Sequence, residues 1–139
     1  MYLAYQEALL QSRAYRTLRS HILRIVEEYQ LSIPEWTLLG LLVDHGSLRV
    51  SELAKLLDVE VPHVTVLVHN LLEKGYVSSA VDEKDSRAKR TTITAKGKKI
   101  LPKIEAKAAT SMVQHSSAVT HKDLESYYKV LDLVSNSAQ

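Results

Sequence analysis

Hydrophobic residues recur three and four positions apart along most of the chain, which is the spacing of one face of an α-helix. Only four glycines and three prolines interrupt this pattern, so long helices joined by short turns are expected. The pattern predicts six helices, over residues 3–29, 34–44, 51–58, 61–74, 95–117 and 120–134. We therefore expect a mainly α-helical protein.

Residues at the start and end of the second helix support its boundaries. Ser32 is placed to cap this helix, with Pro34 in its first turn and Glu35 in the capping-box position. Gly46 follows the last apolar residues and is expected to end it. The segment between them is apolar almost all round, so this helix is expected to be central in the fold.

Other helix ends carry similar signals. Ser51 is expected to cap the third helix, and Pro62 fits the first turn of the fourth. Pro102 is expected to bend the fifth helix. Asp123 stands in the capping-box position relative to Thr120, which predicts the start of the last helix.

Two short segments alternate between apolar and polar residues, as β-strands do. They read YVSSAV and RTTIT, and they flank the charged sequence DEKDSR. This arrangement predicts a β-hairpin with the charged residues at its tip. A brief additional strand is expected in SLRV.

The two faces of helix 61–74 differ in character. The apolar face, expected to be buried, comprises Val64, Leu67, Val68, Leu71 and Leu72. The opposite face carries Pro62, His63, Val66, His69, Asn70 and Glu73, with Thr65 at its edge. An exposed valine among polar residues is hard to explain by folding alone. This face is therefore either a binding surface or, as the alternative, merely solvated or packed against another protein.

Helix 51–58, a tight turn, helix 61–74 and a charged hairpin follow one another in the order of a winged helix-turn-helix. Such a unit places its second helix in the major groove of DNA, and its hairpin on the flanking backbone or minor groove. Asn70 is suited to pair with adenine, and Val66 to press on a thymine methyl group. The candidate DNA contacts on the two helices are Ser51, Pro62, His63, Thr65, Val66, His69 and Asn70.

Positive charge is concentrated in the hairpin region. The whole chain carries a net charge of +2, but residues 74–107 hold ten Lys or Arg against four acids. No Lys or Arg occurs between Val61 and Leu72, so electrostatic affinity for DNA has to come from the hairpin. The hairpin residues expected to meet phosphates are Lys84, Arg87, Lys89 and Arg90.

The run LAKLLDVEVPHVTVLVHNLLEKGYV, followed by DEKDSR and TITAKGKK, resembles the MarR family of bacterial transcription regulators over about residues 31–101. The resemblance implies a homodimer with interlocking N- and C-terminal helices, two winged domains on a palindromic operator and, often, a small ligand that alters their spacing. It assigns residues 1–30 and 98–139 to dimerisation and residues 31–97 to a winged helix-turn-helix region.

The resemblance also assigns Asp85 and Arg87 to the wing, with the arginine entering the minor groove. A carboxylate beside Arg87 is expected to fix the direction of the guanidinium group before it binds. The alternative is that Asp85 only caps the turn, while Arg87 is one of several interchangeable charges.

Composition excludes several other classes of function. The 139 residues, 45% hydrophobic and 24% charged, fit one compact domain or a small domain with helical arms. No apolar run approaches the roughly 18 residues of a membrane span, and the N-terminus lacks the apolar stretch of a signal peptide, so we expect a cytoplasmic protein without a membrane partner. The absence of cysteine excludes disulfides, thiolate ligands and thiol catalysis.

Metal and catalytic chemistry find little support in the sequence. The six histidines stand at positions 21, 45, 63, 69, 115 and 121, and no two of them have the spacing that puts two ligands on one helix face. No nucleophile–base pattern, glycine-rich phosphate loop or carboxylate pair in an apolar setting occurs. We expect neither an enzyme nor a bound cofactor.

A small-molecule site is expected where the first helix meets the winged region. His21, Arg24 and Trp36 would lie there and provide the polar groups that a ligand cleft needs. The alternative is structural, with Trp36 in the core and Arg24 at a surface or dimer contact.

These observations together predict a dimeric, sequence-specific regulator that binds duplex DNA and acts as a repressor. The alternative is a winged-helix module that binds another protein and has no specific DNA target. The two differ in salt dependence, because DNA affinity falls steeply as salt rises.

Overall fold

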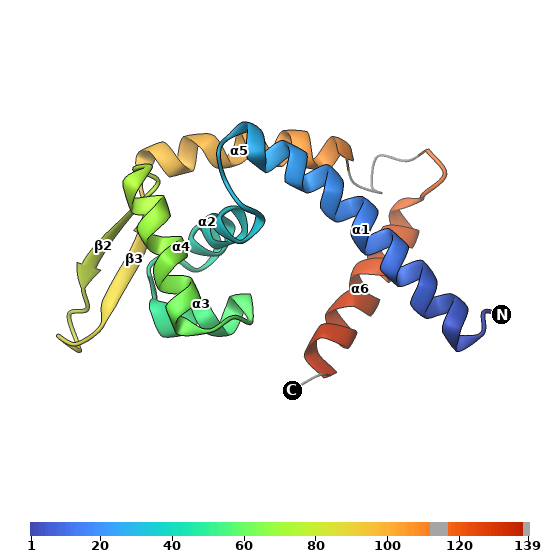
Figure 1. Cartoon of the computed structure of the whole chain (residues 1–139), viewed down its shortest axis with the longest axis horizontal. Coiled ribbons are helices and arrows are strands. Elements are labelled where there is room, and N and C mark those ends of the chain that lie inside the picture. Colours follow the sequence, from blue (N-terminus) through green and yellow to red (C-terminus); the bar gives the residue numbers. More distant parts are fainter. Residues whose placement is uncertain (112–116, 138–139) are drawn as a thin grey trace. The chain divides into compact units, whose positions relative to one another are not determined.

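The computed structural model describes residues 1–111 and 117–137 of the chain, which is mainly α-helical as predicted. Its helices are α1 (Ala4–Glu28), α2 (Ile33–His45), α3 (Val50–Leu57), α4 (Val61–Glu73), α5 (Ala95–Ser111) and α6 (His121–Ser137) (Figure 1). Its strands are β1 (Leu48–Arg49), β2 (Val77–Val81) and β3 (Lys89–Ile93).

The chain divides into two compact units. The winged unit comprises Leu23–Glu105, and the terminal unit comprises Met1–Ile22 with Ala106–Gln139. The winged unit thus extends beyond the predicted residues 31–97 at both ends of the sequence range. The dimerisation role expected for the terminal helices stays a prediction.

Helix α2 has the caps that its sequence predicts. The Ser32 hydroxyl accepts a hydrogen bond from the backbone N–H of Glu35 at 3.2 Å, while Glu35 Oε1 accepts one from the N–H of Ser32 at 2.7 Å. Gly46 ends the helix with φ of +78°, a conformation that side chains disfavour. Leu38, Leu39 and Leu42 of α2 are fully buried, so the helix is central to the winged unit.

The predicted cap of α3 was wrong. The helix begins at Val50, its N-cap residue is Arg49, and Ser51 lies exposed within the first turn. Arg49 is extended because it pairs with Arg90 in the sheet, so the helix starts directly after the strand. Glu52 Oε1 accepts a hydrogen bond from the backbone N–H of Arg49 at 2.9 Å.

Helices α3 and α4 are joined by the tight turn of a helix-turn-helix. Asp58 takes a left-handed conformation with φ of 55° just after α3, and Pro62 stands in the first turn of α4. The predicted buried face is confirmed at Val64, Leu67, Val68 and Leu71. The prediction was wrong for Leu72, which is 38% exposed.

The three strands form an antiparallel sheet in the order β1–β3–β2. The predicted hairpin is confirmed, with pairs running from Val77 and Ile93 at its base to Val81 and Lys89 near its tip. Figure 1 shows β2 and β3 beside α4, with the tip free of the helices. The charge-rich segment 82–88 forms that tip.

A close contact fixes the start of α5 against the base of the hairpin. Thr94 Oγ1 donates a hydrogen bond to the Gly75 carbonyl at 2.6 Å and accepts one from the Gly97 N–H at 3.2 Å. A Cβ atom on Gly97 would stand 2.4 Å from the Tyr76 carbonyl oxygen, so only glycine fits there. The junction between β3 and α5 is therefore sterically specified.

The ends of the last two helices agree in part with the sequence. Pro102 lies inside α5, while the predicted continuation of this helix through residues 112–116 falls outside the described residues. Thr120 and Asp123 exchange hydrogen bonds between side chain and backbone, which confirms the predicted cap. Helix α6 continues three residues past Val134, to Ser137.

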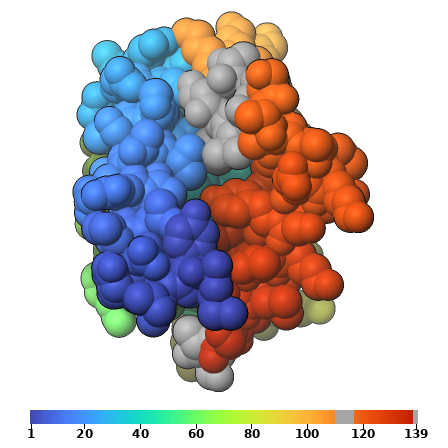
Figure 2. All heavy atoms as spheres, turned by 90° about the vertical axis from the view of Figure 1, so that its right-hand side faces the viewer, coloured from blue at the N-terminus to red at the C-terminus, as the bar shows by residue number. Residues whose placement is uncertain are grey.

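The largest fully buried side chains all belong to the winged unit; they are Val26, Leu38, Leu39, Leu42, Leu53, Val64, Leu71, Thr91 and Ile104. The terminal unit differs, because none of the α6 residues that the structure describes is buried. Figure 2 shows the N-terminal part of α1 and the red helix α6, which both belong to the terminal unit. None of the described helices is long and apolar enough to cross a membrane.

Candidate nucleic-acid interface

Helix α4 presents the predicted face to solvent. Asn70 is half-buried, and the side chain of Val66 remains 56% exposed. The exposed candidates on α4 are Pro62, His63, Thr65, Val66 and His69. An apolar side chain is thus available for contact beside an amide that can both donate and accept hydrogen bonds.

Hydrogen bonds on this face are local. The Thr65 hydroxyl donates to the Val61 carbonyl at 3.1 Å, and His69 Nε2 lies 3.1 Å from Glu73 Oε1. A protonated His69 would therefore face a carboxylate one turn away. Helix α4 offers shape and hydrogen bonds to a partner, with little net charge.

The wing tip holds one arginine in a defined direction. Arg87 is 90% exposed at its side chain, yet its Nε and its backbone N–H both donate to Asp85 Oδ1, at 3.2 and 3.0 Å. These hydrogen bonds, first that of the backbone N–H, lower the pKa of Asp85. The carboxylate therefore caps the turn and also holds the guanidinium group, while the role of this pair in DNA binding stays a prediction.

A second carboxylate organises the base of the wing. The side chain of Asp82 is only 2% exposed, and its Oδ2 accepts from Arg49 Nε at 3.0 Å and from Arg90 Nε at 2.6 Å. Its Oδ1 accepts from the backbone N–H groups of Lys84 and Asp85, at 2.8 and 3.1 Å. The Arg49 hydrogen bond, followed by that of Lys84, holds the pKa of Asp82 well below its usual range.

Arg90 is directed towards this base rather than towards the tip. Its Nη1 donates to the Ser47 carbonyl at 2.8 Å and lies 3.9 Å from Glu52 Oε1. The Arg90 side chain is 38% exposed, so part of it still reaches the surface. Sequence reasoning missed Asp82 and Arg49 at this site, because the pairing of residues 49 and 90 in the sheet, which brings them together, leaves no local signal in the sequence.

The remaining hairpin candidates are solvent-exposed lysines. Lys84 and Lys89 are both exposed, and neither has an ion pair among the residues that the structure describes. They flank Arg87 on either side of the tip. The outward charge of the wing thus comes from Lys84, Arg87 and Lys89.

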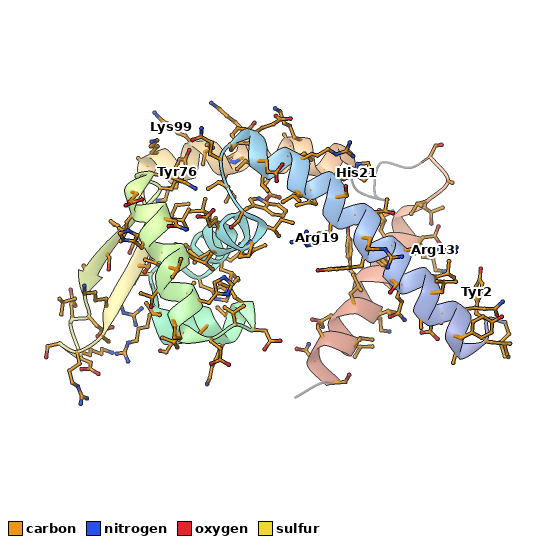
Figure 3. The ribbon with its side chains drawn as sticks, in the orientation of Figure 1. Tyr2, Arg13, Arg19, His21, Tyr76 and Lys99 are labelled. Carbon is orange, nitrogen blue, oxygen red and sulfur yellow. The ribbon has the colours of Figure 1, made fainter. Side chains whose placement is uncertain are left out.

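The three residues of the predicted ligand site lie on two helices, with His21 and Arg24 about one turn apart on α1 and Trp36 on α2. His21 is on α1 in the terminal unit (Figure 3), whereas Arg24 and Trp36 belong to the winged unit. Trp36 is half-buried and its indole N–H donates to Glu105 Oε1 at 2.8 Å. It lines a hollow whose lining residues include neither His21 nor Arg24, so the predicted grouping stays a prediction.

Within residues 1–111 and 117–137, no group of three or more His, Asp or Glu side chains is placed to hold a metal ion. His115 lies outside these ranges.

A short strand, two helices joined by a tight turn and a charged antiparallel hairpin define the winged helix-turn-helix class. The model of the MarR family matches residues 31–89, which span α2 to the start of β3. The chain is 28% identical over 120 residues to YpoP, an uncharacterised HTH-type transcriptional regulator of Bacillus subtilis, covering 86% of this chain and 84% of the relative.

Two solved structures share the fold. A MarR transcriptional regulator from Methanosarcina mazei superposes with a TM-score of 0.82 at 23% identity, covering 96% of this chain and 97% of that protein. The second is BpsR of Bordetella bronchiseptica, whose DNA binding is described as regulated by 6-hydroxynicotinic acid; its TM-score is 0.82 at 16% identity, with 97% and 96% coverage. Residues 31–89 of the chain thus match the MarR family, and the chain shares its fold with these two solved structures.

Proposed function

We propose that the protein binds duplex DNA sequence-specifically, with α4 in the major groove and the hairpin on the adjacent backbone and minor groove. The orientation of Arg87 by Asp85 carries this proposal, because an exposed arginine with a fixed direction loses less side-chain entropy on binding. An arginine gains most over a narrow A·T-rich minor groove, where the negative potential is deepest.

Affinity and specificity come from different elements in this proposal. Lys84, Arg87 and Lys89 supply the attraction to phosphates, which carries no sequence information directly. Asn70 and Val66 of α4 read base edges, since an asparagine pairs with adenine and an apolar side chain contacts the thymine methyl group. Because α4 contains no Lys or Arg, the wing accounts for most of the salt dependence of DNA affinity in this proposal.

We further propose a homodimer on a palindromic operator. Both terminal helices expose apolar side chains, among them Tyr5 and Leu9 of α1 and Leu131 and Val134 of α6. Self-association with two-fold symmetry covers such surfaces and places two α4 helices on two half-sites.

A repressor is the simplest form of such a regulator, because a dimer that occupies an operator blocks access to the same DNA. Release by a small molecule is part of the proposal, and it is supported by BpsR, a protein of the same fold whose DNA binding is described as regulated by 6-hydroxynicotinic acid. The proposed site of action is the cytoplasm.

Selection of bound sequences from a random DNA pool tests the proposal and identifies the operator. On that operator, we expect Asn70→Ala to cost about 1–3 kcal/mol of binding free energy and to relax the preference at one position in each half-site. The slope of affinity against salt should stay nearly unchanged. Equal losses on operator and random DNA would contradict the assignment of Asn70.

The alternative function is a winged-helix module that binds a protein, which the absence of Lys and Arg from α4 favours. Binding to random-sequence duplex at low salt separates the two. A DNA-binding regulator binds such DNA with an affinity that falls steeply as salt rises, whereas an interaction module does not.

A further inference from the structure

Helix α4 carries a carboxylate on the face that is proposed to enter the DNA groove. Residues 61–73 contain no Lys or Arg, and Glu73 is the only acid among them. Its side chain is 68% exposed. Phosphates would repel an isolated carboxylate in this position, so the group that pairs with Glu73 decides how this face meets DNA.

The partner of Glu73 is His69, one turn earlier on the same face of α4. His69 Nε2 lies 3.1 Å from Glu73 Oε1, and the His69 side chain is 67% exposed. Nε2–H therefore donates to the carboxylate, which leaves Nδ1 as the ring nitrogen that can bind another molecule. Among the residues that the structure describes, Glu73 is the only ion-pair partner of His69.

Other charged groups close to α4 do not pair with His69. Helices α2 and α3 and strand β2 pack against α4. The ionisable side chains of α2 are Glu35, Asp44 and His45, those of α3 are Glu52 and Lys55, and β2 has none. Lys74, which follows Glu73 in the chain, is directed to Glu35 at 3.5 Å. The charge of His69 therefore responds to Glu73 and to the molecule that binds this face.

We propose, building on the DNA binding proposed for α4, that His69 contacts DNA as an imidazolium that takes up a proton from solvent on binding. In this form Nε2–H donates to Glu73 and Nδ1–H donates to an acceptor of the DNA, either N7 or O6 of a guanine or a phosphate oxygen. The neutral ring has only a lone pair at Nδ1 and cannot donate to these acceptors. Histidine changes charge between about pH 5 and 8, and the negative potential of DNA favours its charged form.

This contact also accounts for Glu73. An imidazolium and a carboxylate together carry no net charge, so protonation of His69 removes the repulsion between Glu73 and phosphates. The hydrogen bond at Nε2 fixes the direction of the ring before binding, which reduces the side-chain entropy lost in the complex. Glu73 is thus a positioning residue, while His69 is the residue that contacts DNA.

Calorimetry of DNA binding at pH 7, in two buffers that differ in their heat of ionisation, measures the proton uptake. With the full-length protein and its selected operator, we expect an uptake of roughly half to one proton per chain. A proton bound only in the complex makes binding tighter at lower pH, so affinity should rise at least about threefold from pH 8 to pH 6. His69→Gln should remove both effects, and circular dichroism checks that this variant is folded.

The terminal unit provides a matched control for this substitution. His121 Nε2 lies 3.2 Å from Glu125 Oε1, with the same spacing along a helix as His69 and Glu73. The His121 side chain is 88% exposed. We expect His121→Gln to leave the proton uptake and the pH profile of operator affinity unchanged.

Glu73→Gln separates a positioning carboxylate from one that only repels DNA. If Glu73 holds the imidazolium, its loss makes protonation of His69 less favourable and shifts the midpoint of the pH profile of affinity to lower pH. If the carboxylate only repels phosphates, its removal tightens binding by the same factor at every pH. A profile of the second kind would overturn the role proposed for the pair.

Random-sequence duplex at low salt identifies the acceptor. Proton uptake on the operator alone indicates a guanine edge, whereas equal uptake on both DNAs indicates a phosphate. Binding without proton uptake, or uptake that His69→Gln retains, would overturn this contact and leave the DNA-binding proposal standing. A protein that binds neither DNA at any pH from 6 to 8 would overturn both.

Discussion

Asp82 shows how a single buried carboxylate can divide a run of charges into two sets. Its Oδ2 accepts hydrogen bonds from Arg49 and Arg90 and so holds both side chains inwards, at the base of the wing, while its Oδ1 accepts from two backbone N–H groups. Arg87, by contrast, is held outwards by Asp85. The geometry thus explains acidic residues in a segment that is proposed to meet phosphates, because each fixes an arginine in a direction.

The depressed pKa of Asp82 makes the stability of the wing dependent on pH. A carboxylate with a lowered folded-state pKa stabilises the fold fully above its unfolded-state pKa, about 3.9, and loses this contribution as pH falls through the folded-state pKa. We expect Asp82→Asn to lower the free energy of unfolding at pH 7, with a deficit that shrinks as pH falls below about 4. Denaturant titrations from neutral to acid pH check this, and a deficit independent of pH would show that Asp82 does not act through its charge.

The wing tip gives a second residue-scale prediction. Arg87→Ala should weaken operator binding by about 1–3 kcal/mol and more than Lys84→Ala does, with the largest loss at operators flanked by A·T pairs. Asp85→Ala should also weaken binding, although it removes a negative charge, because Arg87 loses its orienting partner. Fluorescence anisotropy at two salt concentrations measures both effects. Tighter binding by Asp85→Ala would show that the carboxylate only repels DNA.

At the scale of elements, local signals predicted most of the fold correctly. The capping box of Ser32 and Glu35, the cap of Asp123 and the alternation in β2 and β3 all depend on residues within a few positions of one another. Ser51 failed as a cap because strand pairing extends the chain through Arg49, an effect of a partner strand about 40 residues away. A local pattern does not contain that information.

At the scale of elements, replacing each of two glycines by alanine is expected to change the stability of the protein in opposite directions. Gly97→Ala should destabilise the protein by about 1–3 kcal/mol, because the added methyl group would overlap the Tyr76 carbonyl and the Ile93 side chain. Gly40→Ala should stabilise it by up to about 1 kcal/mol, since alanine favours the helix interior and meets no neighbour. Thermal unfolding of both variants provides the measurement. A stable Gly97→Ala protein would contradict the close contact between β3 and α5.

For the whole molecule, the sequence predicted the winged helix-turn-helix but not the features that join distant segments. The contact of Trp36 with Glu105 and the cluster of Arg49, Asp82 and Arg90 bring together residues that are far apart in the chain. Periodicity and capping report on neighbours along a helix, whereas these contacts depend on how the helices and strands pack. The charged hairpin was therefore predictable as a surface, while the inward direction of Arg90 was not.

An exposed apolar face of α6, in the terminal unit, predicts that the protein forms a dimer. Along α6, Tyr127, Val130, Leu131 and Val134 lie on one face of the helix, and all are exposed. None of the described α6 residues is buried within the chain, so this apolar stripe has no partner there. Contact with a second copy of the chain would bury it. We therefore expect light scattering to give twice the chain mass of 15.6 kDa at micromolar concentration.

Substitution within α6 tests which face forms the contact. Leu131→Glu places a charge on the apolar stripe and should shift the protein towards a monomer, or unfold it if the monomer is not stable alone. Lys129→Glu introduces the same residue on the opposite face of the helix and should leave the mass unchanged. Because each half-site contact is then made alone, the Leu131→Glu protein should also lose most of its affinity for a two-half-site operator while keeping its salt-dependent binding to random DNA, provided that it folds. A folded wild-type monomer at micromolar concentration, or a Leu131→Glu protein that remains dimeric, would place the interface elsewhere than on this face of α6.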